Sequence, residues 1–389
     1  MNLAFYYHIP IYKSNKGLAI PSYLGVFIDS LAINVDELYL IMHEEKTNIK
    51  QADYILKSKN IKWINLGYKT PSWHRAIFHK KILSKKLKNI YNCNILLVRS
   101  PSPLAPYFNK YFKDVKLVYM IVGDYSEGIK NMKTKNLRQK LIKLFLYYNI
   151  FLFEKSIQNI NLVVNSTMLF QKYKSFTNSI HQIRTTTLSA SDFFYKEDTC
   201  LSKKINLVYS GRIDPQKGLF ELIEATALLN NSGYEVVCNL VGWEEDTSEP
   251  VKKSLMAFSR LKEIENNIIF HGRKKVGSEL NTIYRIGDIY VIPSYHEGFP
   301  RTIWEAMANS LPVVASNVGA IPDFLTHDKN VIIINPKSAN EIFEAIKRVI
   351  NDNEFRENMI KEGRALAKKN TLEFQTKKLI NILENVAHN

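Results

Sequence analysis

Two glutamates eight residues apart, Glu297 and Glu305, flank a stretch that could bind an anion. The backbone N–H groups of Gly298, Phe299 and Arg301 lie where a helix is expected to begin. A helix N-terminus carries roughly half a positive charge and suits a phosphate. A carboxylate on each side of that phosphate could accept hydrogen bonds from hydroxyl groups, a layout that a nucleoside diphosphate sugar would match. The alternative is that both acids are ordinary surface groups at a helix start.

A second candidate group is the turn at residues 211–218, which holds Arg212 and Lys217. Gly211 allows the backbone to turn tightly. The two basic side chains are close enough in the chain to contact one diphosphate. Taken alone, two basic residues in a turn are more often simply solvated. Beside the paired glutamates, the diphosphate interpretation is favoured.

The residues around the glutamates predict the elements that position them. Residues 289–293 are an apolar run typical of a buried strand, and residues 294–298 form a polar loop. Pro300 can begin the helix, because the N–H that proline lacks would have no partner there. Residues 313–315 return as a second buried strand. The loop therefore follows the carboxyl end of a strand, where open α/β sheets bind ligands.

This stretch resembles the E-x7-E signature of retaining glycosyltransferases of family 4, which have the GT-B fold. It departs from the usual pattern at Ser310, where glycine is usual, and at Gly319-Ala320, where paired glycines are frequent. The positions that match are Glu297, Gly298, Pro300, Glu305, Ala306, Met307, Ala308, Pro312, Val313, Val314, Ala315 and Ser316.

The resemblance implies a role for each charged residue. Glu305 would hold the ribose hydroxyls of a nucleotide-sugar donor, and Glu297 the hydroxyls of its sugar. Residues 211–218 resemble the family's G-R-x-x-x-x-K-G element, so Arg212 and Lys217 would stabilise the departing diphosphate. Enzymes of this kind are thought to transfer the sugar with retention on one face, without a protein nucleophile. No Asp-x-Asp motif is present, so we expect no obligatory metal and no other cofactor.

Two further strand ends are expected at the same site. Gly242 follows the strand at 236–241, and Arg273 follows the strand at 268–270 in a segment that resembles the nucleobase-holding segment of relatives. The full set of expected donor-binding residues is Gly211, Arg212, Lys217, Gly242, Arg273, Glu297, Gly298, Phe299, Pro300 and Glu305.

The first half of the chain offers fewer candidates, all in loops after expected strands. Family members usually have a glycine-rich loop facing the acceptor, and here only Gly17 remains of it. Arg99 and Asp124 follow the strands at 95–98 and 117–122. Many relatives have a catalytic-site histidine near the second position, where this chain has Asp124. Asp124 is therefore the nearest catalytic candidate, or else a turn or helix cap.

The chain is long enough for two domains, because 389 residues exceed one ordinary core. Both halves show the strand–helix alternation of an α/β fold, and the resemblance implies GT-B: two Rossmann-like domains facing each other across a cleft. We expect an acceptor domain at residues 1–190 and a donor domain at 191–370. A helix at 371–389 would cross back to the first domain. The polar stretch 190–204 is the expected linker.

Charge is distributed unevenly between the two halves. Residues 1–190 hold 28 Lys and Arg but 10 Asp and Glu, whereas residues 191–389 hold 25 and 27. Such asymmetry indicates an anionic partner for the first half. A lysine-rich genome is the alternative, although it should act on both halves alike.

Two segments could bring the first half to an anionic membrane. Residues 75–91 predict a helix that has no acid, with an apolar stripe and a basic face. Contact with anionic lipid and simple solvation of that face are both open. The apolar run 144–153 is expected to be buried between sheet and helix, and contact with lipid is its alternative. We see no signal peptide and no membrane span, and three distant cysteines indicate a reducing compartment.

The predicted function is retaining transfer of a sugar from a nucleotide sugar to a glycan or lipid-linked glycan in bacterial surface polysaccharide synthesis. The expected location is cytoplasmic, peripheral on the inner face of the membrane. A GT-B nucleotide-sugar 2-epimerase and a catalytically inactive sugar-nucleotide-binding protein are the alternatives. A nucleic-acid partner is not expected, because the basic half lacks a helix-turn-helix, RRM or zinc pattern.

Overall fold

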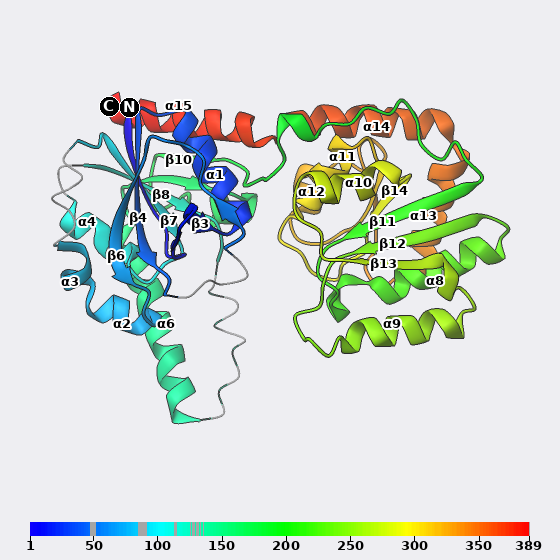
Figure 1. The fold of residues 1–389 in the computed structure, drawn as a ribbon, viewed down its shortest axis with the longest axis horizontal. Coiled ribbons are helices and arrows are strands. Elements are labelled where there is room, and N and C mark those ends of the chain that lie inside the picture. The colour runs from blue at the N-terminus through cyan, green and yellow to red at the C-terminus, as the bar shows by residue number, and fades with distance from the viewer. Residues whose placement is uncertain are drawn as a thin grey trace. The chain divides into compact units, whose positions relative to one another are not determined.

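The computed structural model describes residues 1–46, 52–84, 92–112, 115–124, 126, 129, 132, 134 and 136–388. The chain forms two compact units (Figure 1). Unit 1 comprises Met1–Thr185 with Gln375–Asn389, and unit 2 comprises Thr186–Phe374. The expected boundaries at residues 190 and 370 lie within a few residues of these.

Unit 1 is built on a seven-stranded parallel sheet of order β10-β9-β8-β7-β1-β4-β6. A small antiparallel sheet of order β2-β3-β5 accompanies it. The strands are β1 (Asn2–Tyr6), β2 (Tyr12–Ser14), β3 (Gly17–Ile20), β4 (Glu37–Glu44), β5 (Tyr54–Ile55), β6 (Ile61–Tyr68), β7 (Ile95–Ser100), β8 (Lys116–Ile121), β9 (Asn161–Val164) and β10 (Ile180–Gln182). The described helices are α1 (Ser22–Ile33), α2 (Ser72–Ile77), α3 (His79–Ser84), α4 (Phe108–Tyr111), α6 (Leu137–Ser156), α7 (Thr167–Tyr173) and α15 (Leu372–His388).

The apolar runs became the central strands of this sheet. All six residues of β7 are buried, as expected for a parallel strand covered on both faces. The β2–β3 hairpin was not predicted, and neither were β5 and β10. These strands are two to four residues long, so they are too short to show a period in the sequence.

The prediction of one amphipathic helix over residues 75–91 was wrong in its first part. The chain forms two short helices, α2 and α3, with Phe78 as the C-cap of α2, and residues 85–91 lie outside the described part. Arg75 was assigned to the basic face but is buried. Ile77 was assigned to the apolar stripe but is 62% exposed.

The prediction that residues 144–153 are buried was also wrong for most of α6. Leu144 is 66% and Phe151 60% exposed, and Phe153 is the buried end of the run. Figure 1 shows the N-terminal turns of α6 extending beyond the rest of unit 1. The helix nevertheless begins at a regular cap, because the side chain of Asn136 accepts a hydrogen bond from the Gln139 N–H. None of the described helices is both long and apolar enough to span a bilayer.

Unit 2 contains a six-stranded parallel sheet of order β13-β12-β11-β14-β15-β16. Helices α8 and α9 lie on one side of it, and α10 and α11 on the other (Figure 1). The strands are β11 (Lys204–Ser210), β12 (Glu235–Val241), β13 (Ile268–Gly272), β14 (Ile289–Ile292), β15 (Val313–Ser316) and β16 (Ile332–Ile334). The helices are α8 (Leu219–Asn231), α9 (Pro250–Leu261), α10 (Ser278–Ile286), α11 (Thr302–Ala308), α12 (Ile321–Phe324), α13 (Ala339–Asn351) and α14 (Asn353–Lys368).

The polar stretch 190–204 is packed on unit 2 rather than forming a free linker. Asp198 forms an ion pair of 2.6 Å with Arg356, whose side chain is 1% exposed. The N–H of Cys200 donates to the carboxylate of Asp288. Its polar residues are therefore structural partners of unit 2, which the broken sequence pattern could not reveal.

Candidate active site

The carboxyl ends of β11 and β14 bring Lys217 and Glu297 together. Lys217 ends the 3-10 turn Pro215–Lys217, which Asp214 caps by accepting from the Gln216 N–H. Its Nζ lies 2.6 Å from Glu297 Oε1, and both side chains are largely buried. Ser294 also donates to Glu297, at 2.9 Å. These contacts fix the lysine and the carboxylate at one position, each with little exposure to water.

Glu305 lies on α11 within a buried hydrogen-bond network. Its Oε1 accepts from the Thr187 hydroxyl at 3.2 Å and its Oε2 from the Tyr284 hydroxyl at 3.0 Å. Burial raises the pKa of Glu305, and these two hydrogen bonds oppose that change only in part. Ionising Glu305 in the folded protein therefore costs free energy, as is common for functional groups.

Lys217, Glu297 and Glu305 all line one hollow of about 330 Å³. Trp243, Val276 and Leu280 give it an apolar wall, and Lys274 adds a cation. The predicted donor residues that line it are Gly211, Arg212, Lys217, Gly242, Glu297, Phe299, Pro300 and Glu305.

Two predicted donor residues, Gly298 and Arg273, are not among those that line the hollow. Gly298 precedes Phe299, and a Cβ added to Gly298 would meet no atom within 4 Å. The guanidinium of Arg273 lies over the Trp243 ring, 4.8 Å from its centroid. Arg273 therefore supports a lining residue, and its neighbour Lys274 takes the position on the wall.

Arg212 is the most exposed of the basic residues predicted to contact the diphosphate. Its side chain is 47% exposed and pairs with Glu245 at 3.1 Å. The pair lies in water, where it is weak enough to exchange for a ligand.

Gly242 allows the loops after β11 and β12 to approach each other. A Cβ at Gly242 would lie 1.7 Å from the carbonyl oxygen of Gly211, an impossible contact. The Gly211 N–H donates to Val241 at 3.0 Å, so the two loops are joined directly. A side chain at residue 242 would therefore push apart two walls of the hollow.

The helix after Glu297 begins later than predicted. Pro300 lies before α11, whose N-cap is Arg301 and whose first residue is Thr302. The Phe299 ring stacks on Trp304 at 4.6 Å, which fixes the loop against the helix. Glu305 remains in the first turn and a half of the helix, facing the interior.

Comparison with known proteins decides the class of enzyme. Residues 194–366 match the family model of glycosyl transferases group 1. Protein CapJ of Staphylococcus aureus is 27% identical over 350 residues, which are 88% of this chain and 82% of CapJ. The capsular polysaccharide biosynthesis glycosyltransferase CapM of the same organism is 25% identical over 252 residues, 61% and 64% of the two chains. HepE of Anabaena in complex with UDP is 16% identical with a TM-score of 0.71, covering 99% of this chain and 100% of HepE.

The chain is a glycosyltransferase with the GT-B fold. The two parallel sheets, each in its own unit, are those of the two Rossmann-like domains. The matched residues 194–366 all belong to unit 2, the unit that contains the hollow with Glu297 and Glu305.

The sequence did not predict three residues of the site. Each of them donates a hydrogen bond to one of the two glutamates. Thr187 and Tyr284 hold Glu305, and Ser294 holds Glu297. Tyr284 lies on an amphipathic helix, where its spacing predicts only a core residue. Thr187 lies far from Glu305 in the sequence, so no local pattern could join the two.

In unit 1 the three acceptor-side candidates lie on different elements and have different local partners. Gly17 begins β3 in the β2–β3 hairpin, paired with Ser14. Arg99 is part of β7 rather than of a loop, and its guanidinium lies 4.8 Å from the Tyr7 ring centroid. Asp124 follows β8, where its carboxylate pairs with Lys172 at 2.8 Å and accepts from the Ser126 N–H. This pairing lowers the pKa of Asp124 despite its partial burial, so the group is a carboxylate at neutral pH.

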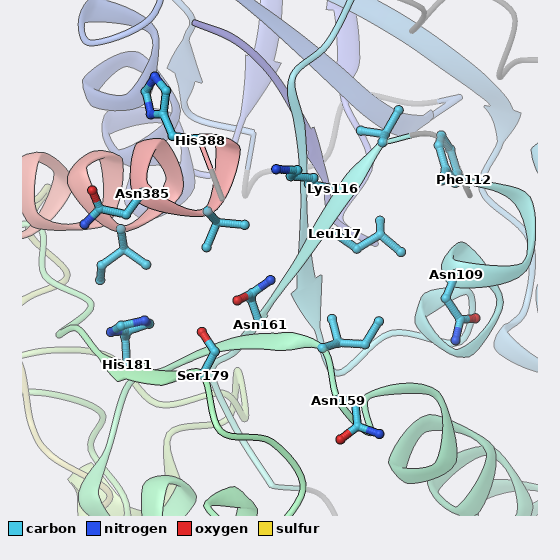
Figure 2. Close-up of a pocket in the computed structure, with 14 residues that line it drawn as sticks. Asn109, Phe112, Lys116, Leu117, Asn159, Asn161, Ser179, His181, Asn385 and His388 are labelled. Atoms are coloured by element: carbon cyan, nitrogen blue, oxygen red, sulfur yellow. The ribbon is translucent and has the colours of Figure 1, made fainter.

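A larger hollow of about 910 Å³ lies at the opposite edge of the unit 1 sheet of the glycosyltransferase. Lys116 and Asn161 are the first residues of β8 and β9, so this hollow faces the amino ends of the strands. Figure 2 shows His181, Asn385 and His388 around it. No candidate from the sequence lies there, as expected for the edge away from the carboxyl ends.

Proposed function

We propose that this glycosyltransferase moves a sugar, with retention, from a nucleoside diphosphate sugar to a glycan or lipid-linked glycan in bacterial surface polysaccharide synthesis. The observation that carries the proposal is the pairing of Lys217 with Glu297 in the hollow that Glu305 also lines. It supplies a cation for a diphosphate and two carboxylates for hydroxyls. The capsular polysaccharide name of CapM and the UDP in HepE support the pathway and the donor class.

The main electrostatic demand of the reaction is charge on the leaving group. The bond between the anomeric carbon and the diphosphate oxygen breaks, the acceptor oxygen bonds to the same carbon on the same face, and the proton of the acceptor hydroxyl passes to the departing diphosphate. The departing diphosphate gains negative charge, which Lys217 and Arg212 are positioned to stabilise. Because Lys217 is already desolvated beside Glu297, little reorganisation is needed when that charge develops.

Glu305 is assigned to the ribose hydroxyls of the donor. Its carboxylate is held by Thr187 and Tyr284 from inside the unit, and the residue also lines the hollow. A carboxylate can accept more than one hydrogen bond at each oxygen, so both oxygens retain capacity for ligand hydroxyls.

A donor screen tests the proposed function. The purified enzyme is incubated with UDP-, GDP- and ADP-sugars, and released nucleoside diphosphate and sugar are identified by NMR. We expect cleavage of one donor class, with the sugar's anomeric configuration retained at first release. A changed sugar still attached to its nucleotide would indicate the 2-epimerase. Binding without any chemistry would indicate the inactive sugar-nucleotide-binding protein.

We also propose that unit 1 associates with an anionic membrane through α6. Its exposed apolar residues recur at alternating intervals of four and three along one stripe of the helix, formed by Leu137, Leu141, Leu144, Tyr148 and Phe151. Arg138, Lys140 and Lys155 are exposed on the same helix. An apolar stripe beside basic residues suits the interface of an anionic bilayer, where each cation contributes about 1 kcal/mol.

Vesicle co-sedimentation tests this association. Wild-type protein should pellet with anionic vesicles at low salt and less so at 1 M salt, where the Debye length is about 3 Å. Leu144→Asp should weaken the binding. Leu261→Asp, at a residue of unit 2 that is 77% exposed, is the matched control and should not. Equal binding to neutral and anionic vesicles, or none to either, would contradict the proposal.

A further inference from the structure

A cavity of about 150 Å³ lies at the carboxyl edge of the unit 1 sheet. His8, Ser102 and Asp124, which follow β1, β7 and β8, contribute to its polar wall. Arg75 enters from α2. Phe145 and Ile150 belong to an apolar wall supplied by α6. Its position is the edge at which parallel sheets bind their ligands.

Arg75 is a buried cation that has no anionic partner in the described part of the chain. Its side chain lines the cavity, yet the residue is only 3% exposed. Nη2 makes a long contact of 3.4 Å with the Ser72 hydroxyl, and Nε and Nη1 have no hydrogen-bond partner. The carboxylate of Asp124, which lines the same cavity, is paired with Lys172.

Within the described residues, no unpaired anionic group lines the cavity beside Arg75. His8 Nδ1 is also buried without a partner. Burial, and then the charge of Arg75, lower the pKa of His8 to about 4, so that its imidazole is neutral at pH 7. Removing a charge from water without a counter-charge is costly, and buried charges in proteins are normally paired. The cavity therefore has a strong electrostatic preference for an anion.

We infer that this cavity binds an oxyanion of the acceptor substrate, a phosphate or carboxylate, through Arg75. The guanidinium offers several N–H donors in a rigid plane, which is the geometry that such groups accept. Ser72 and Ser102 add hydroxyl donors, and the α6 wall suits an apolar portion attached to the anion. The assignment to the acceptor rests on the proposed function, whereas the assignment of an oxyanion rests on the cavity alone.

Thermal unfolding of the full chain with inorganic phosphate tests the oxyanion site. UDP is kept saturating so that the unit 2 hollow is occupied, and ionic strength is held constant with chloride. Phosphate should raise the unfolding midpoint of the wild type by about 2–4 °C. Arg75→Met should abolish that rise and, without phosphate, unfold no earlier than wild type, because it removes an unpaired buried charge.

Two variants serve as comparisons for Arg75→Met. Lys62→Met removes a surface cation of the same unit that pairs with Glu37, and it should respond to phosphate as wild type does. Arg75→Lys keeps a charge without the planar donors and should retain a smaller response. An equal phosphate response in wild type and Arg75→Met, or none in either, would overturn the site. Early unfolding of Arg75→Met without phosphate would make Arg75 structural and would overturn it too.

Kinetics identify the source of the oxyanion. With a lipid-linked diphosphate sugar as acceptor, Arg75→Met should lower kcat/KM about 10- to 100-fold. With the same sugar as an uncharged alkyl glycoside, the two proteins should be equal. An equal loss with both acceptors would overturn the acceptor assignment, as would loss of vesicle binding in Arg75→Met, which would indicate a lipid headgroup. If no donor is turned over by any protein, the proposed function fails, and the phosphate titration still decides the cavity.

Discussion

The two units differ in whether the charged side chains at their candidate sites have partners. In unit 2 both glutamates of the hollow have partners: Glu297 pairs with Lys217 at 2.6 Å, and Glu305 accepts hydrogen bonds from two hydroxyls. In unit 1 the cavity wall includes Arg75, which is buried and has no anionic partner among the described residues. On the proposed function, unit 2 would therefore be organised before a donor binds, whereas an anionic ligand would stabilise the buried charge of unit 1.

The formal charges of the two halves follow the same division. The excess of 28 basic over 10 acidic residues lies in residues 1–190, and residues 191–389 are nearly balanced. We propose that a few placed groups of unit 2, rather than its net charge, would bind a donor diphosphate. An excess of this size favours association with anions in general.

The largest effect should come from removing the cation of unit 2. Lys217→Ala leaves the developing charge on the diphosphate without its desolvated partner, and Glu305→Ala removes the acceptor for donor hydroxyls. Each should cost about 2–4 kcal/mol of transition-state stabilisation, or about 30- to 1,000-fold in kcat/KM. Steady-state transfer with the identified donor measures the loss.

The matched control for Lys217→Ala and Glu305→Ala is Lys203→Ala. Lys203 forms an ion pair with Glu235 that is mostly exposed at the other end of the unit 2 sheet. Its removal should change kcat/KM by less than about twofold. Wild-type turnover in Lys217→Ala would contradict the proposal that Lys217 stabilises the departing diphosphate.

The next largest effect should come from separating the two loops that Gly242 allows to approach each other in unit 2. Gly242→Ala places a Cβ against the Gly211 carbonyl oxygen, so the loops after β11 and β12 must separate. We expect a loss of about 1–3 kcal/mol in the free energy of unfolding, together with weaker nucleotide binding. Gly233→Ala is the control, because Gly233 also has a positive φ but a Cβ there meets no atom within 4 Å. Equal losses in the two variants would show that the loop contact is unimportant.

A smaller effect on the free energy of unfolding is expected for Glu305→Gln, and it should stabilise the protein where Gly242→Ala destabilises it. Burial raises its folded pKa, so the folded protein binds the proton more tightly than the unfolded chain. The stabilisation from this group is complete below the ordinary glutamate pKa and is lost as pH rises through the folded pKa. Glu305→Gln should therefore be as stable as wild type at pH 7, or more stable, while losing donor affinity. Chemical unfolding at pH 4 to 8 measures this, and a large destabilisation at pH 7 would show that the carboxylate is structural.

The smallest effect should come from chelation. We propose that Lys217 and Arg212 take the place of a divalent cation at the diphosphate, so transfer in EDTA should stay within about twofold of the untreated rate. Complete loss of transfer, restored by Mg²⁺ or Mn²⁺, would contradict this.

The unit 2 site could be predicted well from sequence because its elements are local. Apolar runs such as residues 289–292 became strands, and the loops that follow them meet at one edge of a parallel sheet. That rule, together with the family resemblance, assigned Lys217 and Glu297 to one site although they are 80 residues apart. It could not supply Thr187 or Tyr284, because side-chain partners from other elements leave no spacing in the sequence.

Unit 1 could be predicted less well, and the errors share one physical cause. Arg75 was expected on a solvated face because charged residues are rarely buried, and the apolar run of α6 was expected inside because such runs are rarely exposed. Local preference predicts neither outcome, because tertiary packing decides which side chains are buried. Departures from such rules are concentrated at functional positions, which is why the errors direct attention to this unit.

Calorimetric titration of the cognate nucleoside diphosphate into three proteins tests the contrast between the units most directly. Wild type and Arg75→Met should bind it with the same affinity, because the unit 2 hollow contains no residue of unit 1. Lys217→Ala should bind it about 30-fold or more weakly. Equal affinity in wild type and Lys217→Ala, or a comparable loss in Arg75→Met, would contradict the account.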